Sequence, residues 1–109
     1  MAHFICIVQD GQAAHRETAA LEAGLHDIYA EHFDAEPTTV TWRVVPSGQM
    51  FTEGRPSTSS IIAPQLARST TLEQREGFMR AICDLWTATT GCTDHEIVVA
   101  ITEIEQPAG

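Results

Sequence analysis

Apolar positions in the first part of the chain follow two different rhythms. Residues 4–9 (FICIVQ) form a short β-rich run that ends at the turn pair Asp10-Gly11, which predicts a strand. Over residues 13–33 the apolar positions instead recur at helical spacing. Pro37 cannot continue that helix, and residues 38–45 (TTVTWRVV) again have the composition of a strand. The first part therefore predicts strand, helix and strand.

The second part repeats this order. Residues 60–66 (SIIAPQL) predict a third strand, in which Pro64 favours an edge or bulged position. Thr70 and Glu73 fit a capping box, and Gly91 stands where a helix commonly ends in the left-handed conformation, so we expect a helix between them. Residues 96–105 (EIVVAITEIE) predict a fourth strand. The Pro-, Gly- and Ser-rich residues 46–59 predict a loop or hairpin between the two parts.

The apolar stripes of the two predicted helices match at a constant shift of 57 positions. The stripe of the first helix maps in this way onto that of the second, with Leu21, Leu25, Ile28 and Tyr29 corresponding to Phe78, Ile82, Leu85 and Trp86. The same shift, with no gap, takes residues 38–41 onto 95–98 and residues 4–5 onto 61–62. The alternative is the generic rhythm of any strand–helix–strand protein, but the constant register favours a duplicated unit. We interpret residues 1–109 as one domain with halves 2–45 and 60–105.

Two such units define the expected fold class, an α/β (α+β sandwich) fold. Right-handed crossovers place the two strands of each unit parallel, which gives a four-stranded sheet with two helices on one face. The four predicted strands are apolar at nearly every position, as in strands that are buried on both sides. A chain of 109 residues can cover the second face by association, so we expect a compact symmetric oligomer.

Charge and cysteine content exclude several classes of function. A formal charge of −9 argues against a nucleic-acid groove and against an anionic membrane surface. No lysine is present, so no side-chain amine can form a Schiff base. Cys6, Cys83 and Cys92 form no CxxC pair, and we expect reduced thiols with Cys92 the most exposed, no metal and no cofactor. With no apparent export signal or membrane span, we expect a cytoplasmic protein.

Several stretches together resemble the tautomerase superfamily, over roughly residues 2–105. Residues 33–45 (FDAEPTTVTWRVV) resemble the helix-to-strand junction of 4-oxalocrotonate tautomerase. Residues 72–103 resemble the second half of malonate semialdehyde decarboxylase. Residues 44–51 and 60–68 resemble segments of cis-3-chloroacrylic acid dehalogenase. The resemblance implies doubled βαβ units that assemble as trimers.

The resemblance also implies a catalytic proline directly after the initiator methionine, and Ala2 stands at that position. Of the family's other functional residues, Arg68 matches the first of two substrate-binding arginines and His26 matches the dehalogenase's helix histidine. The remaining functional positions carry other residues here, namely Gln12, Thr39, Thr41, Thr70 or Thr71, and Ala100. Neither dehalogenation nor decarboxylation by the family's mechanism is therefore supported.

Two residues are our candidates for catalysis. Arg68 stands at a strand end just before a helix start, where it would anchor an anion; the alternative is a surface ion pair. His26 could shuttle a proton; the alternative is a helix-flank histidine bonded to a neighbour. Four further candidates for substrate binding are Ala2, His3, Gln12 and Glu103. Alternation could turn His3 outward, and Glu103 could be an ordinary solvated carboxylate.

The function that follows is a cofactor-independent isomerase, hydratase or lyase that acts on a small anionic carbonyl or enol substrate. Its site would be repurposed, because Ala2 replaces the proline base. One alternative is a specialised isomerase or cyclase of secondary metabolism. Another is a non-catalytic homotrimer that binds a small acid or a protein.

Overall fold

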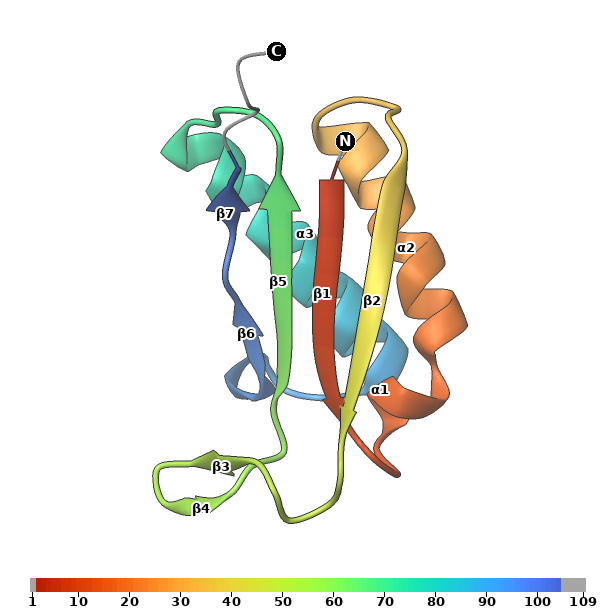
Figure 1. Cartoon of the computed structure of the whole chain (residues 1–109), viewed down its shortest axis with the longest axis vertical. Helices are drawn as coiled ribbons and strands as arrows, with labels where there is room; N and C mark the ends of the chain where they lie inside the picture. Colours follow the sequence, from red (N-terminus) through yellow and green to blue (C-terminus); the bar gives the residue numbers. More distant parts are fainter. Residues whose placement is uncertain (1, 105–109) are drawn as a thin grey trace.

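The computed structural model describes residues 2–104, and its elements follow the predicted order (Figure 1). The first half consists of β1 (Ala2–Gln9), α1 (Ala13–Arg16), α2 (Thr18–His32) and β2 (Thr38–Val45). A small hairpin of β3 (Phe51–Thr52) and β4 (Arg55–Pro56) follows. The second half consists of β5 (Ser60–Leu66), α3 (Leu72–Thr90), the 3-10 turn η1 (Asp94–Glu96), β6 (Ile97–Val99) and β7 (Thr102–Glu103).

The main sheet has the order β2-β1-β5-β6, and β7 pairs with β5 beyond β6. Within each half the strands are parallel, while β1 and β5 are antiparallel neighbours with Ala2 opposite Leu66. Both long helices cover the same face of the sheet and lie behind it in Figure 1. This arrangement confirms the expected fold class of a doubled βαβ unit with its helices on one face.

The core lies between the sheet and the two helices, and Phe78 of α3 is at its centre. The ring of Phe78 has no exposed surface and lies 5.0 Å from the ring centroid of Phe33, 6.1 Å from Phe4 and 6.4 Å from Tyr29. Alternate residues of β1 point into this core, because successive side chains of a strand face opposite sides of the sheet. Aromatic packing therefore joins β1 and both helices.

The other face of the sheet has no helix over it. It presents apolar side chains from three strands: Ile5, Ile7, Ile61, Ala63 and Val98. We call these five residues the outer apolar face. Val98 is 49% exposed, and the others are half-buried within the chain. The apolar runs predict strands that are buried on both faces. Within one chain, however, the helices cover one face of the sheet and the other is open.

Three local predictions at helix ends had different outcomes. Gly91 ends α3 in the left-handed conformation with φ 76°, as predicted. The capping box predicted at Thr70 and Glu73 is wrong by one residue. Thr71 is the N-cap: its hydroxyl accepts from the Gln74 N–H at 3.1 Å, and the Gln74 side chain accepts from the Thr71 N–H at 2.8 Å. The predicted first helix is two helices, because Glu17 departs from helical geometry between α1 and α2.

Pro64 lies in a central strand, so the predicted edge position is wrong. The carbonyls of Ile62 and Leu66 accept hydrogen bonds from Ala100 at 3.0 Å and Ile104 at 2.7 Å, so this side of β5 faces the last strand. Pro64 has no N–H to donate between these two contacts. The predicted fourth strand is accordingly interrupted there and forms the short strands β6 and β7.

The helices keep the repeat register predicted from the sequence, but the strands do not. Leu21, Leu25 and Tyr29 and their counterparts 57 positions later all have no exposed surface. In the first strands, however, the counterpart of buried Phe4 is buried Ile62, 58 positions on, and not Ile61. The pairing of β6 with β5 makes Val99 the counterpart of Val40, 59 positions on. The duplication therefore includes short insertions, and the prediction of a gapless repeat is wrong.

Candidate functional site

The N-terminal end of β1 is where most of the candidate residues gather. Antiparallel pairing places Ala2 opposite Leu66, and Arg68 follows two residues later. The end of α2 and the start of β2 reach the same place, since the Ala2 N–H donates to the Pro37 carbonyl at 3.4 Å. We call this region, formed by Ala2, His26, Tyr29, Asp34, Glu36 and Arg68, the β1 mouth. It lies at the end of the molecule where the N-terminus is marked in Figure 1.

Arg68 provides the positive charge of the β1 mouth. Its Nη1 lies 3.0 Å from Asp34 Oδ2, and its Cζ lies 5.3 Å from the ring centroid of Phe33. Desolvation lowers the pKa of Arg68, but hydrogen bonding to Asp34 and Tyr29 and the charge of Asp34 outweigh it, so the pKa is raised. The Asp34 side chain is 54% exposed, so the ion pair is open to water. A guanidinium carries five N–H donors, and this contact engages one nitrogen.

Tyr29 is a functional candidate that sequence reasoning missed. Its spacing predicts only that it belongs to the apolar stripe, and Tyr29 has no exposed surface in the structure. Its hydroxyl, however, donates to Glu36 Oε2 at 3.2 Å. Burial and then the Glu36 carboxylate raise the pKa of Tyr29, while Arg68 acts in the opposite direction. A tyrosine in an apolar stripe that is followed closely by acidic residues was the available signal, because a buried phenol needs a polar partner.

His26 lies on α2 one turn before Tyr29 and is half-buried. Its Nδ1 is hydrogen bonded to the hydroxyl of Thr38, which pairs with Ala2 in the sheet. His26 thus belongs to the β1 mouth through its contact with Thr38, the strand partner of Ala2. The sequence offered the alternative that His26 is a helix-flank histidine bonded to a neighbour. The structure contains such a bond, and the partner is the hydroxyl of Thr38.

His3 points to the outer face of the sheet. Its Nδ1 is hydrogen bonded to the Thr39 hydroxyl, and its Nε2 to that of Thr41 at 3.1 Å. Strand alternation separates His3 from Ala2, which faces the core. Any role of His3 in a site therefore requires a partner on the outer face.

Gln12 lies beyond the far end of β1, so the structure does not bring it to Ala2 within one chain. Glu103 lies at the same end of the sheet as Ala2, opposite Leu66 in the β7 pairing. Its Oε1 accepts from the Thr70 N–H at 2.9 Å and the Thr70 hydroxyl at 2.5 Å, and lies 3.3 Å from Arg75 Nη1. Glu103 therefore connects β7 to the start of α3 through hydrogen bonds and an ion pair.

Glu103→Gln is expected to lower the melting temperature at neutral pH but not in acid. The Thr70 hydroxyl and backbone N–H, and then Arg75, hold the pKa of Glu103 below its ordinary value. A lowered folded-state pKa stabilises the protein above the unfolded pKa, and this contribution is lost as pH falls through the folded pKa. Thermal unfolding between pH 7 and pH 3 measures the difference. Glu76→Gln on the exposed side of α3 is the control, and a difference independent of pH would contradict the assignment.

Within residues 2–104, no three His, Cys, Asp or Glu side chains are grouped so that they could hold a metal ion. Over the same range, no helix combines the length and apolar character needed to cross a membrane.

No protein-family model matches the chain, and no curated protein matches it. Solved structures do match. "Native Ps01740" is 24% identical with a TM-score of 0.88, over 98% of this chain and 97% of that one. Pt0534 inactivated by 2-oxo-3-pentynoate is 19% identical with a TM-score of 0.86, over 98% and 89%. N1, a member of the cis-3-chloroacrylic acid dehalogenase family, is 16% identical with a TM-score of 0.83, over 94% and 75%. The chain thus has the fold of the tautomerase superfamily.

Proposed function

We propose that this chain is a tautomerase-like, cofactor-independent enzyme, an isomerase or a related hydratase or lyase, that acts on a small anionic carbonyl or enol compound at the β1 mouth. The observation that carries the proposal is the Arg68 guanidinium, which Asp34 holds through one nitrogen and which lies next to the Tyr29–Glu36 pair. Arg68 follows Leu66, the strand partner of Ala2, by two residues. Pt0534, a protein of similar fold, was solved after inactivation by 2-oxo-3-pentynoate. This inactivator is by its chemical name a 2-oxo acid, which supports an anionic carbonyl substrate for the present chain.

In this mechanism Arg68 binds a carboxylate or enolate oxygen, because charge-assisted hydrogen bonds from a guanidinium favour such groups. The substrate carboxylate displaces the exposed Asp34 side chain from Arg68. His26 moves the proton, since an imidazole can accept and donate protons near neutral pH. The buried Tyr29 hydroxyl interacts with Arg68, and it can stabilise the developing enolate if its O–H turns from Glu36 to the substrate oxygen.

The experiment is an assay with phenylpyruvate, 2-hydroxymuconate and unsaturated three-carbon acids. We expect turnover above background with at least one of these, and its loss in Arg68→Ala and His26→Ala. Arg55→Ala in the exposed β4 and His95→Ala in η1 are matched controls that lie outside the β1 mouth. Turnover that is absent with all substrates, or equal in all variants, would contradict the proposal.

A second candidate function is a non-catalytic binder of small acids. Ala2 in place of the proline base favours it, as does the Asp34 carboxylate already bound to Arg68. The same carboxylates would then raise the melting temperature without being converted. A specialised isomerase or cyclase with another substrate would give neither result with this panel, and screening a wider set of enols would identify it.

We propose further that the chain assembles as a homotrimer through the outer apolar face. Fused 4-OT, which shares the fold at a TM-score of 0.83 and 16% identity over 94% of this chain and 85% of that one, was solved as a symmetric trimer. The five apolar side chains of the outer face supply the surface that association would bury.

Ile5→Asp is expected to convert a trimer of about 36 kDa, three times 11.9 kDa, into a monomer. The new carboxylate would be buried without a partner at the centre of the outer apolar face. Light scattering measures the mass, and circular dichroism checks that the variant is folded. Ala20→Asp, at an exposed position of α2, should remain trimeric. A monomeric native protein at tens of micromolar would rule out the trimer.

A further inference from the structure

The doubled unit builds a second mouth at the opposite end of the sheet. Because β1 and β5 are antiparallel, the start of β5 lies beside the end of β1. Ser60 begins β5 as Ala2 begins β1, 58 positions earlier, which is the shift that relates Phe4 to Ile62. The end of α3 at Thr90 stands where the end of α2 stands in the β1 mouth. We call this region the β5 mouth.

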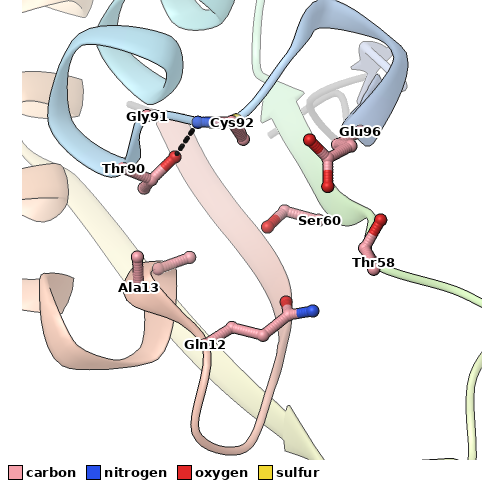
Figure 2. A pocket seen from close by; sticks show the side chains of 9 residues that line it. Gln12, Ala13, Thr58, Ser60, Thr90, Gly91, Cys92 and Glu96 are labelled. Atoms are coloured by element: carbon pink, nitrogen blue, oxygen red, sulfur yellow. Dashed lines mark hydrogen bonds between the residues drawn. The ribbon is translucent and has the colours of Figure 1, made fainter.

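The β5 mouth is hollow. It holds a cavity of about 290 Å³, at the lower end of the roughly 300–1,000 Å³ typical of ligand pockets. Polar side chains from three parts of the chain surround it: Gln12, Thr58, Ser60, Thr90, Cys92 and Glu96. Figure 2 shows these side chains around one open space, with Ser60, Thr58 and Glu96 close together and Gln12 apart from them.

Two polar groups of this cavity have no hydrogen-bond partner among residues 2–104. One is the Ser60 hydroxyl, although Ser60 is only 4% exposed, and the other is the Gln12 amide. The Thr90 hydroxyl, by contrast, donates to the Trp86 carbonyl at 2.7 Å and accepts from the Cys92 N–H at 3.2 Å. Neither group is sealed in the protein interior: Gln12 is half-buried, and both side chains line the cavity. Their hydrogen-bonding capacity is therefore available to a polar occupant of the cavity.

Glu96 is the charged side chain among the lining residues. Its Oε1 accepts from the Thr93 N–H at 3.0 Å and the Thr93 hydroxyl at 3.1 Å. The Thr93 N–H and then the Thr58 hydroxyl lower the pKa of Glu96, so the carboxylate is ionised at neutral pH. No arginine lines this cavity, whereas Arg68 dominates the β1 mouth. The two ends of the sheet therefore favour ligands of opposite charge.

We propose that the β5 mouth binds a small aliphatic ammonium compound. Its N–H donors would reach the Glu96 carboxylate and the Ser60 hydroxyl, and its carbon chain would lie against the methyl groups of Ala13 and Ala14. The Gln12 amide oxygen accepts from a second donor at the other side of the cavity. This inference is independent of the activity at the β1 mouth, because the two mouths share no residue.

The test uses three four-carbon probes: 1,4-diaminobutane, 1,4-butanediol and succinate. The readout is the rate at which iodoacetamide, a neutral reagent, alkylates Cys92, with the label located by mass spectrometry. Cys92 is half-buried in the cavity lining, while Cys6 and Cys83 are buried. Burial raises the pKa of the Cys6 thiol to about 12, which keeps that thiol unreactive. Diaminobutane should slow Cys92 alkylation about tenfold at ten times its Kd, and the other two probes should not.

Glu96→Gln keeps an acceptor for Thr93 but removes the charge, and it should abolish the protection. Glu73→Gln, in the first turn of α3, changes the net charge equally and should leave it intact. Ser60→Ala, which removes the unpartnered hydroxyl, should weaken protection severalfold and serves as the second variant if Glu96→Gln does not fold. Protection that is equal with butanediol, unchanged in both Glu96→Gln and Ser60→Ala, or lost in Glu73→Gln would overturn the proposal. The last result would indicate diffuse attraction of cations to a chain of charge −9.

Discussion

Phe78→Ala is expected to lower the free energy of unfolding by about 3–5 kcal/mol, the usual cost of truncating a buried phenylalanine. The ring has no exposed surface and touches aromatic rings of β1, of α2 and of the residue after α2. Removing the ring leaves a cavity between α3, β1 and the end of α2, and these segments cannot all move in to fill it. Since small domains are stable by about 5–15 kcal/mol, this change approaches the whole stability of the protein.

Urea unfolding at a fixed protein concentration measures the loss, and the concentration must be fixed because association would add to apparent stability. Leu72→Ala is the matched control: the residue starts the same helix and is 63% exposed, so its truncation should change stability by no more than about 0.5 kcal/mol. Phe78→Leu should lie between the two. A cost below about 1 kcal/mol for Phe78→Ala would mean that the aromatic cluster does not hold the helices to the sheet.

Arg68→Ala is expected to lower kcat/KM on the substrate identified by the assay by about tenfold to a hundredfold. That range corresponds to the roughly 1.5–3 kcal/mol of a hydrogen bond to a charged group. Arg68→Lys keeps the charge but loses the planar fork, so it should recover only part of the activity. Steady-state kinetics on both variants, with Arg55→Ala as an exposed arginine control, measures the effect.

Asp34→Asn separates substrate binding by Arg68 from a purely structural ion pair. If Asp34 competes with the substrate for the guanidinium, removing its charge should lower KM and leave kcat nearly unchanged. A structural ion pair predicts the opposite, because Asp34→Asn and Arg68→Ala would then reduce activity and stability together. That second pattern would contradict the role of Arg68 as an anion anchor.

Much of the fold follows from local patterns in the sequence. Residues 38–45 and 60–66 are strands over the predicted bounds, because β-rich runs bounded by turn residues leave few other solutions. The two helical stripes keep their shift of 57 positions, since helix packing repeats the same buried face. The strands follow shifts of 58 and 59, because the connections of the two halves differ in length by one or two residues. This difference becomes visible only in the register with which the strands pair.

Pairing between distant strands determines the candidate site. Arg68 and Ala2 are 66 positions apart and meet only because β1 and β5 are antiparallel in one register. Gln12 lies at the opposite end of β1 from Ala2. The resemblance places both residues at functional positions, but in this chain Ala2 belongs to the β1 mouth and Gln12 to the β5 mouth. Tyr29 shows the same limit within a helix, because periodicity predicts its burial but not the Glu36 carboxylate that its hydroxyl binds.

By itself, the sequence determined the order of strands and helices and the doubled unit, because both follow from neighbouring residues and their spacing. The tertiary structure alone decided that Arg68 lies against Asp34 and Phe33, that the sheet has one open apolar face, and that the second mouth is hollow and acidic. These features depend on the register between β1 and β5. That register is set by burying Phe4, Ile62 and the helix stripes in one core, which no local stretch encodes.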